Sequence, residues 1–276
     1  MMSFIAFPTL LDCTFSGNSA TSVGGGMTVS ESFPTLTDCL FSDNTATESG
    51  GGLRVGSSEL STVTGCRFLR NAAESGGGVW VHSGGNLALT GNRLSRGHEL
   101  GRNDAARERE TMFTDCSFVL NQAADGGGLH CEDEETAVLT NCTFQRNAAS
   151  ESGGGLCCQH STRAILTNCI ISFSEGGGAV HCADEATVAL TCSDVYGNEG
   201  GDWTDCISGQ EATEGNFCED PRFCVEANPE WPLMLWSDSP CAAENNPTCG
   251  LVGAWDVGCD TPVEATSWGA VKAMFR

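Results

Sequence analysis

A repeat of about 25 residues is the feature that most constrains this chain. The segment LTDCLFSDNTATESGGGLRV, residues 36–55, returns as VTGCRFLRNAAESGGGVWV, FTDCSFVLNQAADGGGLHC, LTNCTFQRNAASESGGGLCC and LTNCIISFSEGGGAVHC. Each repeat holds short alternating stretches of strand length between polar or glycine corners, and none shows a ten-residue helical period. A single turn cannot bury its own apolar face, so successive turns must stack at the ~4.8 Å spacing of paired strands. The sequence therefore predicts an all-β fold, a single-stranded parallel β-helix (a solenoid) of about eight turns.

Two columns of like residues run through these repeats, and we interpret both as structural. The cysteine column contains Cys39, Cys66, Cys116, Cys142 and Cys169. The asparagine column, three residues after the phenylalanine of each repeat, contains Asn18, Asn44, Asn71, Asn121 and Asn147. Asparagine tolerates left-handed corners, and stacked amides can hydrogen-bond from turn to turn. Inward cysteines stack well as small reduced side chains, and the alternative is a vertical disulfide such as Cys131–Cys158 or Cys142–Cys169.

The paired motif FxxN and GG[AG][LIV] resembles the repeats of chlamydial polymorphic outer-membrane proteins and of secreted bacterial right-handed β-helix repeat proteins. In this chain it reads FSGN/GGGM, FSDN/GGGL, FLRN/GGGV, FVLN/GGGL and FQRN/GGGL. The resemblance implies a right-handed helix and a passenger, adhesin or other surface protein. Some β-helix relatives are polysaccharide lyases or hydrolases.

Two regions depart from the repeat, and they set the expected domain organisation. We expect the β-helix to comprise residues 1–199. Within it, residues 91–112 have the length of one turn but lack its motifs, so we interpret them as a degenerate turn. The alternative is a functional loop. Residues 200–260 form a Cys/Trp-rich region that we expect to cap the open end of the stack. Its disulfide candidates are Cys206, Cys218, Cys224, Cys241, Cys249 and Cys259. The stretch DPRFC…SPC within it resembles the closing segment of secreted β-helix proteins. Residues 261–276 are expected to be an exposed tail.

Composition restricts the cellular compartment of the protein and the classes of partner that it can bind. Thirteen Lys and Arg against 36 Asp and Glu give a net charge of −23, which argues against a nucleic-acid partner. Seventeen cysteines indicate an oxidising compartment, so we expect an extracellular or cell-surface protein. No signal peptide is visible, and because the chain starts almost inside a repeat we expect its N-terminus to be incomplete. No apolar run is long enough for a helix that spans a membrane. We expect the protein to be a monomer.

Two groups of side chains are candidate metal ligands. Aligned glycine-rich strands place His130, Cys157 and His181 in one outward column on successive turns, where N and S ligands could converge on Zn²⁺. The acidic residues Glu132, Asp133, Glu135, Asp184 and Glu185 follow those strands and could bind Ca²⁺ through oxygen atoms. In each case the alternative is a solvated polar surface.

We expect a non-catalytic protein, without a required cofactor, that binds a glycan or a host or cell-surface protein through its long faces. One alternative is a polysaccharide lyase or glycoside hydrolase of β-helix type, either with or without Ca²⁺ as a cofactor. Another is a structural spacer of a larger surface protein. A cleft with a basic residue facing clustered carboxylates favours the enzyme, whereas flat faces favour adhesion or spacing.

Overall fold

The structure is a computed structural model of the whole chain. It describes residues 2–4, 8–30, 34–48, 50–56, 61–69, 71, 73, 79–82, 87–90, 93–94, 98–100, 110–131, 136–224 and 233–260. Among them, no helix is long and apolar enough to cross a membrane.

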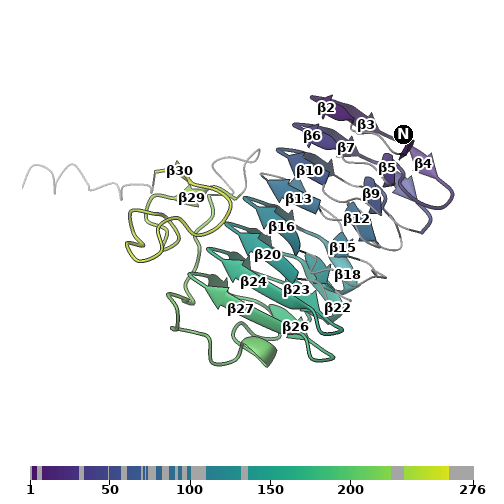
Figure 1. The fold of residues 1–276 in the computed structure, drawn as a ribbon. Helices are drawn as coiled ribbons and strands as arrows, with labels where there is room; N and C mark the ends of the chain where they lie inside the picture. Colours follow the sequence, from purple (N-terminus) through teal and green to yellow (C-terminus); the bar gives the residue numbers. More distant parts are fainter. Residues whose placement is uncertain are drawn as a thin grey trace, which may run out of the picture.

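Three parallel sheets of eight strands each wind around a common core, which confirms the predicted right-handed β-helix (Figure 1). The first sheet contains β1 (Met2–Phe4), β5 (Met27–Ser30), β9 (Leu53–Gly56), β12 (Val79–His82), β15 (His98–Leu100), β19 (Leu129–Cys131), β23 (Leu156–Cys158) and β26 (Val180–Cys182). The second contains β2 (Thr9–Leu11), β6 (Thr35–Thr37), β10 (Ser61–Thr64), β13 (Leu87–Thr90), β16 (Glu110–Thr114), β20 (Thr136–Thr140), β24 (Arg163–Thr167) and β27 (Thr187–Thr191). The third contains β3 (Thr14–Ser16), β7 (Leu40–Ser42), β11 (Arg67–Leu69), β14 (Arg93–Leu94), β17 (Ser117–Val119), β21 (Thr143–Gln145), β25 (Ile170–Ser172) and β28 (Asp194–Tyr196).

Shorter elements lie at the corners and beyond the last turn. Two short parallel pairs join corners of adjacent turns, β4 (Ser19–Ala20) with β8 (Thr45–Ala46) and β18 (Gln122–Asp125) with β22 (Ala148–Ser152). The 3-10 helix η1 (Asp205–Ile207) follows the last turn, and the C-terminal strands β29 (Leu235–Trp236) and β30 (Val257–Cys259) pair with each other.

Like residues stack directly over one another inside the helix. Phe15, Phe41 and Phe68 are parallel neighbours with ring centroids 4.7 and 4.8 Å apart, close to the spacing of paired strands. Phe118 stacks on Phe144 at 4.4 Å. The core therefore consists of continuous apolar columns. The glycine corners are crowded: a Cβ on Gly128 would lie 2.6 Å from the carbonyl oxygen of Gly155.

The asparagine column forms the predicted ladder, with one correction. Asn147 Nδ2 donates to the carbonyl of Phe118 at 3.0 Å, while its Oδ1 accepts hydrogen bonds from the backbone and side-chain nitrogens of Asn121. The left-handed corner belongs to the preceding residue, such as Leu120 (φ 55°) or Arg146 (φ 51°). Asparagine does take the left-handed conformation before the cysteines, at Asn141 (φ 52°) and Asn168 (φ 54°). Our expectation was wrong for the column that follows phenylalanine, because the amide there is held inside the corner by hydrogen bonds to neighbouring turns.

The interval 91–112 continues the stack as far as the structure describes it. Strand β14 pairs with β11 and β17, and β15 pairs with β12 and β19. The turns are uneven: 19 residues separate the paired Trp80 and Glu99, and 31 separate Glu99 from His130. The extra residues of the longer turn include 101–109, which lie outside the described residues. The interpretation as a degenerate turn and the alternative of a functional loop therefore both remain predictions.

The C-terminal region occupies two places. Residues 201–217 lie at the end of the stack, with η1 beside β26 and β27 (Figure 1). There Gln210 Oε1 accepts a hydrogen bond from Leu190 N, and Asn216 Oδ1 accepts one from Ser193 N, so side chains satisfy the open strand edges.

Residues 233–260 run along the outer face of the third sheet and form what we call the flank segment. Gly253 N donates to the carbonyl of Asn168 at 2.8 Å, and Trp255 Nε1 donates to Ser117 Oγ at 2.6 Å. Leu235 and Val252 form a second small apolar core with Ile170 of β25. The flank segment thus covers a side of the stack and does not extend its end.

Candidate binding groove

The register that we predicted for the zinc candidates is confirmed. His130 pairs with Cys157, and Cys157 pairs with His181, on β19, β23 and β26. The surroundings of these side chains differ from the outward, accessible column that we expected. Cys157 is fully buried, its Sγ accepts a hydrogen bond from Gln159 Nε2, and burial raises the pKa of its thiol to about 12. His181 Nδ1 lies 2.5 Å from Asp205 Oδ2 of η1.

The described residues contain no group of three or more His, Cys, Asp or Glu side chains placed to hold a metal ion. Among the calcium candidates, Glu132, Asp133 and Glu135 lie outside the described residues. Asp184 and Glu185 form an exposed left-handed corner, where Asp184 Oδ2 lies 3.5 Å from His160 Nε2. Both metal sites therefore remain predictions.

The cysteine column consists of buried thiols. Cys142 and Cys169 each donate to the carbonyl two residues earlier in the chain, to Thr140 and Thr167. Burial raises the pKa of the Cys66 thiol to about 12, which keeps it protonated and unreactive at neutral pH. The vertical disulfides Cys131–Cys158 and Cys142–Cys169 are absent from the structure, so that alternative was wrong.

Three disulfides join the C-terminal region to itself and to the stack: Cys182–Cys206, Cys192–Cys249 and Cys224–Cys259. Four of the six candidates are therefore bonded, whereas Cys218 and Cys241 are thiols. Cys182 and Cys192, which were not among those candidates, supply the other two bonded sulfur atoms. They pair with this region because β26 and β27 are the last strands of their sheets, and the chain that covers them supplies the sulfur atoms.

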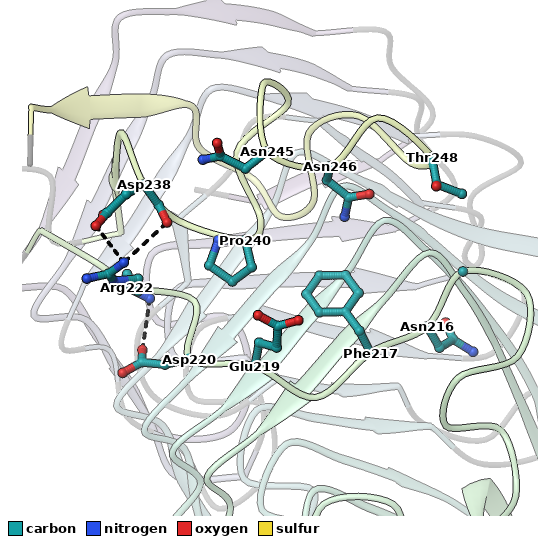
Figure 2. Close-up of a pocket in the computed structure, with 11 residues that line it drawn as sticks. Asn216, Phe217, Glu219, Asp220, Arg222, Asp238, Pro240, Asn245, Asn246 and Thr248 are labelled. Atoms are coloured by element: carbon teal, nitrogen blue, oxygen red, sulfur yellow. Dashed lines mark hydrogen bonds and ion pairs between the residues drawn. The ribbon is translucent and has the colours of Figure 1, made fainter.

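A groove that the sequence analysis did not anticipate lies where the flank segment meets the chain leaving the last turn (Figure 2). Its volume is about 660 Å³. Residues 215–222 form one wall and residues 238–248 the other. The lining residues are Gly215, Asn216, Phe217, Glu219, Asp220, Arg222, Asp238, Pro240, Asn245, Asn246 and Thr248.

An ion pair joins the two walls at one end. Arg222 Nη1 lies 2.5 Å from Asp238 Oδ2 and also donates to the Asp238 carbonyl at 3.3 Å. The backbone N–H of Arg222 donates to Asp220 Oδ1. Asn245 fixes the opposite wall, since its Nδ2 donates to the carbonyls of Ser237 and Ser239. Figure 2 shows Glu219 and Phe217 in the middle of the groove, beside Pro240.

A buried carboxyl anchors the first wall to the stack. Asp194 of β28 is fully buried; its Oδ1 accepts the backbone N–H of Glu219 at 3.1 Å and its Oδ2 accepts the thiol of Cys241 at 3.4 Å. Burial raises the pKa of Asp194 to about 8. Asp194 does not line the groove, so its role here is to hold residue 219 in place.

Part of this site had a signal in the sequence. The stretch DPRFC…SPC, which we recognised as a closing segment, supplies Asp220, Arg222 and Pro240. The sequence showed these residues as a terminal pattern, but it gave no sign that the two halves face each other.

Comparison with known proteins gives two family matches. Residues 8–148 match the family model described as "Right handed beta helix region". Residues 141–159 match the "Chlamydia polymorphic membrane protein" repeat. No curated protein and no solved structure matched the chain.

Proposed function

The chain belongs to the right-handed β-helix family, and from this premise we propose that it is a non-catalytic secreted or surface-exposed protein that binds glycans in its C-terminal groove. The observation that carries the proposal is the groove between residues 215–222 and 238–248. Three disulfides and the polymorphic membrane protein repeat support an extracellular or cell-surface setting.

The chemistry of the lining suits a neutral sugar. Sugars present hydroxyl groups at their edges and C–H groups on their faces, so they need polar side chains beside an apolar surface. The groove offers the Glu219 carboxylate, the Thr248 hydroxyl and the Asn246 amide around Phe217 and Pro240. A small number of placed polar groups beside an apolar surface is the usual composition of a ligand site.

The two walls of the groove are fixed relative to each other in the protein without a ligand. The Arg222–Asp238 ion pair links them, and Cys192–Cys249 ties the second wall to the chain between β27 and β28. Because the walls are already ordered, the protein loses little conformational entropy when a ligand binds.

A glycoside hydrolase is the second candidate, because Glu219, Asp220 and Asp238 share the groove with Arg222, which is the combination of a basic residue and clustered carboxylates that we expected of an enzyme. Such enzymes need two carboxyl groups across the scissile bond, one of them with a raised pKa that lets it act as the acid. Arg222 forms an ion pair with Asp238, so this carboxylate already has a partner within the protein. Asp194, whose pKa burial raises, lies outside the groove. These observations support binding without turnover.

The proposal is tested on the disulfide-intact protein with a glycan array, followed by titration calorimetry on the best neutral oligosaccharide. Glu219→Gln should weaken that binding by about tenfold, because one charge-assisted hydrogen bond is lost. Glu244→Gln is the matched control, since Glu244 is exposed on the same segment and does not line the groove. Release of reducing ends from the bound glycan would establish the hydrolase instead. No binding to any glycan, or equal binding by both variants, would overturn the proposal.

A further inference from the structure

A second cavity of about 350 Å³ adjoins the groove. It lies between the stack and the flank segment and is lined by Gln145, Arg146, Phe173, Asp220, Arg222, Phe223 and Trp236. Asp220 and Arg222 line both cavities, so the two are neighbours separated at that pair.

Two arginines line this cavity of an acidic protein. The chain has 13 Lys and Arg against 36 Asp and Glu, yet two arginines and one aspartate line this space. They come from distant parts of the sequence: Arg146 from the corner after β21, and Arg222 from the chain that follows the end of the stack. The fold thus brings together two guanidinium groups from distant parts of an acidic chain.

The two arginines differ in what they already bind. Arg222 is paired with Asp238. The guanidinium of Arg146 is exposed and takes part in no hydrogen bond or ion pair within the described part of the chain. Its backbone is fixed, because Arg146 N donates to the carbonyl of Ser172 in the next turn. A guanidinium on a rigid corner, with its five N–H donors available, can bind a planar or tetrahedral oxyanion through two parallel hydrogen bonds.

Aromatic side chains complete the cavity. Phe173, Phe223 and Trp236 line it and are half-buried, so part of each ring remains accessible. The rings of Phe173 and Tyr196 pack in a T-shaped contact, with ring centroids 5.8 Å apart. The backbone N–H of Trp236 donates to the carbonyl of Arg222, which ties one ring to one arginine. An aromatic surface beside a guanidinium suits a sugar ring that carries an anionic substituent.

We propose that this cavity is a subsite for a sugar residue bearing a carboxylate or a sulfate, adjacent to the groove that holds its neutral neighbours. The inference rests on the proposed function and adds the class of glycan. Arg146 is the residue that distinguishes the anionic sugar, and the shared Asp220 and Arg222 separate it from the neutral part.

The test compares oligosaccharides that differ only in the presence of an anionic group, by calorimetry on the intact protein at physiological ionic strength. The probes are a hyaluronan hexasaccharide with its carboxyl-reduced counterpart, and a cellohexaose monosulfate with cellohexaose. At least one anionic member should bind about tenfold more tightly than its neutral partner, and the preferred pair identifies carboxylate or sulfate as the group recognised. Arg146→Gln should remove that preference, and Arg146→Lys should restore part of it.

Arg163→Gln is the matched control, since Arg163 is exposed on β24 and lines neither cavity. If neutral probes bind in the groove but charge makes no difference, or if Arg146→Gln behaves like Arg163→Gln, the inference is overturned and the proposed function stands. If no probe binds, neutral or charged, both fail.

Discussion

The buried asparagine of each turn shows how one side chain serves two turns. Its Oδ1 accepts the backbone N–H of the equivalent asparagine in the previous turn, and its Nδ2 donates to a phenylalanine carbonyl there. Aspartate lacks the donor, and a longer amide would not fit a corner where Asn44 and Asn147 are fully buried. The column was predictable because it repeats. Its burial was not, since a polar residue at a corner usually faces water.

Replacing one buried member of this ladder should cost more than replacing its exposed end. Asn147→Ala leaves the N–H of Asn121 and the carbonyl of Phe118 buried without a side-chain partner, so we expect a loss of about 2–5 kcal/mol in the free energy of unfolding. Asn18→Ala should cost less than about 1 kcal/mol, because Asn18 is exposed and donates to an Asn44 oxygen that keeps its second donor. Urea unfolding measures both. Equal losses would contradict the ladder.

Asp194 should make stability depend on pH in an unusual direction. Its pKa in the folded protein is raised to about 8, above its value in the unfolded chain. Between about pH 4 and pH 8 the unfolded state loses this proton while the folded state keeps it, so the free energy of unfolding falls as pH rises, by up to about 1.4 kcal/mol per pH unit. Asp194→Asn should remove that slope.

The difference between Asp194→Asn and the wild type should therefore widen in favour of the variant from pH 5 to pH 8. Urea unfolding at several pH values measures it, and the exposed Glu244→Gln is the control for general charge effects. If the free energies of unfolding of the wild type and of Asp194→Asn change with pH in the same way, the buried carboxyl does not retain its proton.

Among the elements, the flank segment is the one that the sequence did not allow us to place. A repeat predicts contacts between residues one period apart, and this rule correctly placed the columns and the His130–Cys157–His181 register. No period relates residues 233–260 to β17, β21 and β25, so the same rule says nothing about their contact. The flank segment covers the outer side of these strands through hydrogen bonds to Thr143 and Ser117. The groove was missed for the same reason.

Two glycines of the flank segment provide a matched test of this contact. Both have left-handed backbones, Gly253 with φ 95° and Gly250 with φ 75°. A Cβ on Gly253 would lie 2.6 Å from Ile170 Cδ1 and 2.8 Å from Thr143 Oγ1, whereas one on Gly250 would meet nothing within 4 Å. Gly253→Ala should therefore lose about 1–3 kcal/mol more than Gly250→Ala, because only it also disturbs packing.

Hydrogen exchange measures the effect locally. The amides of residues 252–255 should lose protection in Gly253→Ala while those of β20 and β24 keep theirs. Equal behaviour of the two variants would place the flank segment away from the third sheet.

At the scale of the whole molecule, a stack of parallel turns is closed at its end and covered along one side by its own C-terminal chain. The disulfides follow this plan: Cys182–Cys206 fastens the end, Cys192–Cys249 fastens the side, and Cys224–Cys259 closes the flank segment. The second of these closes a loop of 57 residues, which restricts the unfolded chain by about 4 kcal/mol in the loop-entropy account. The site that we propose for glycans exists only because the chain returns along the stack.

Peptide mapping of the alkylated, unreduced protein by mass spectrometry tests this arrangement most directly. The account predicts three cross-linked pairs, Cys182–Cys206, Cys192–Cys249 and Cys224–Cys259, together with alkylated thiols at Cys142, Cys169, Cys218 and Cys241. Cross-links confined to residues 200–260, or vertical links such as Cys142–Cys169, would contradict it, because the C-terminal chain would then not be fastened to the last turn of the stack.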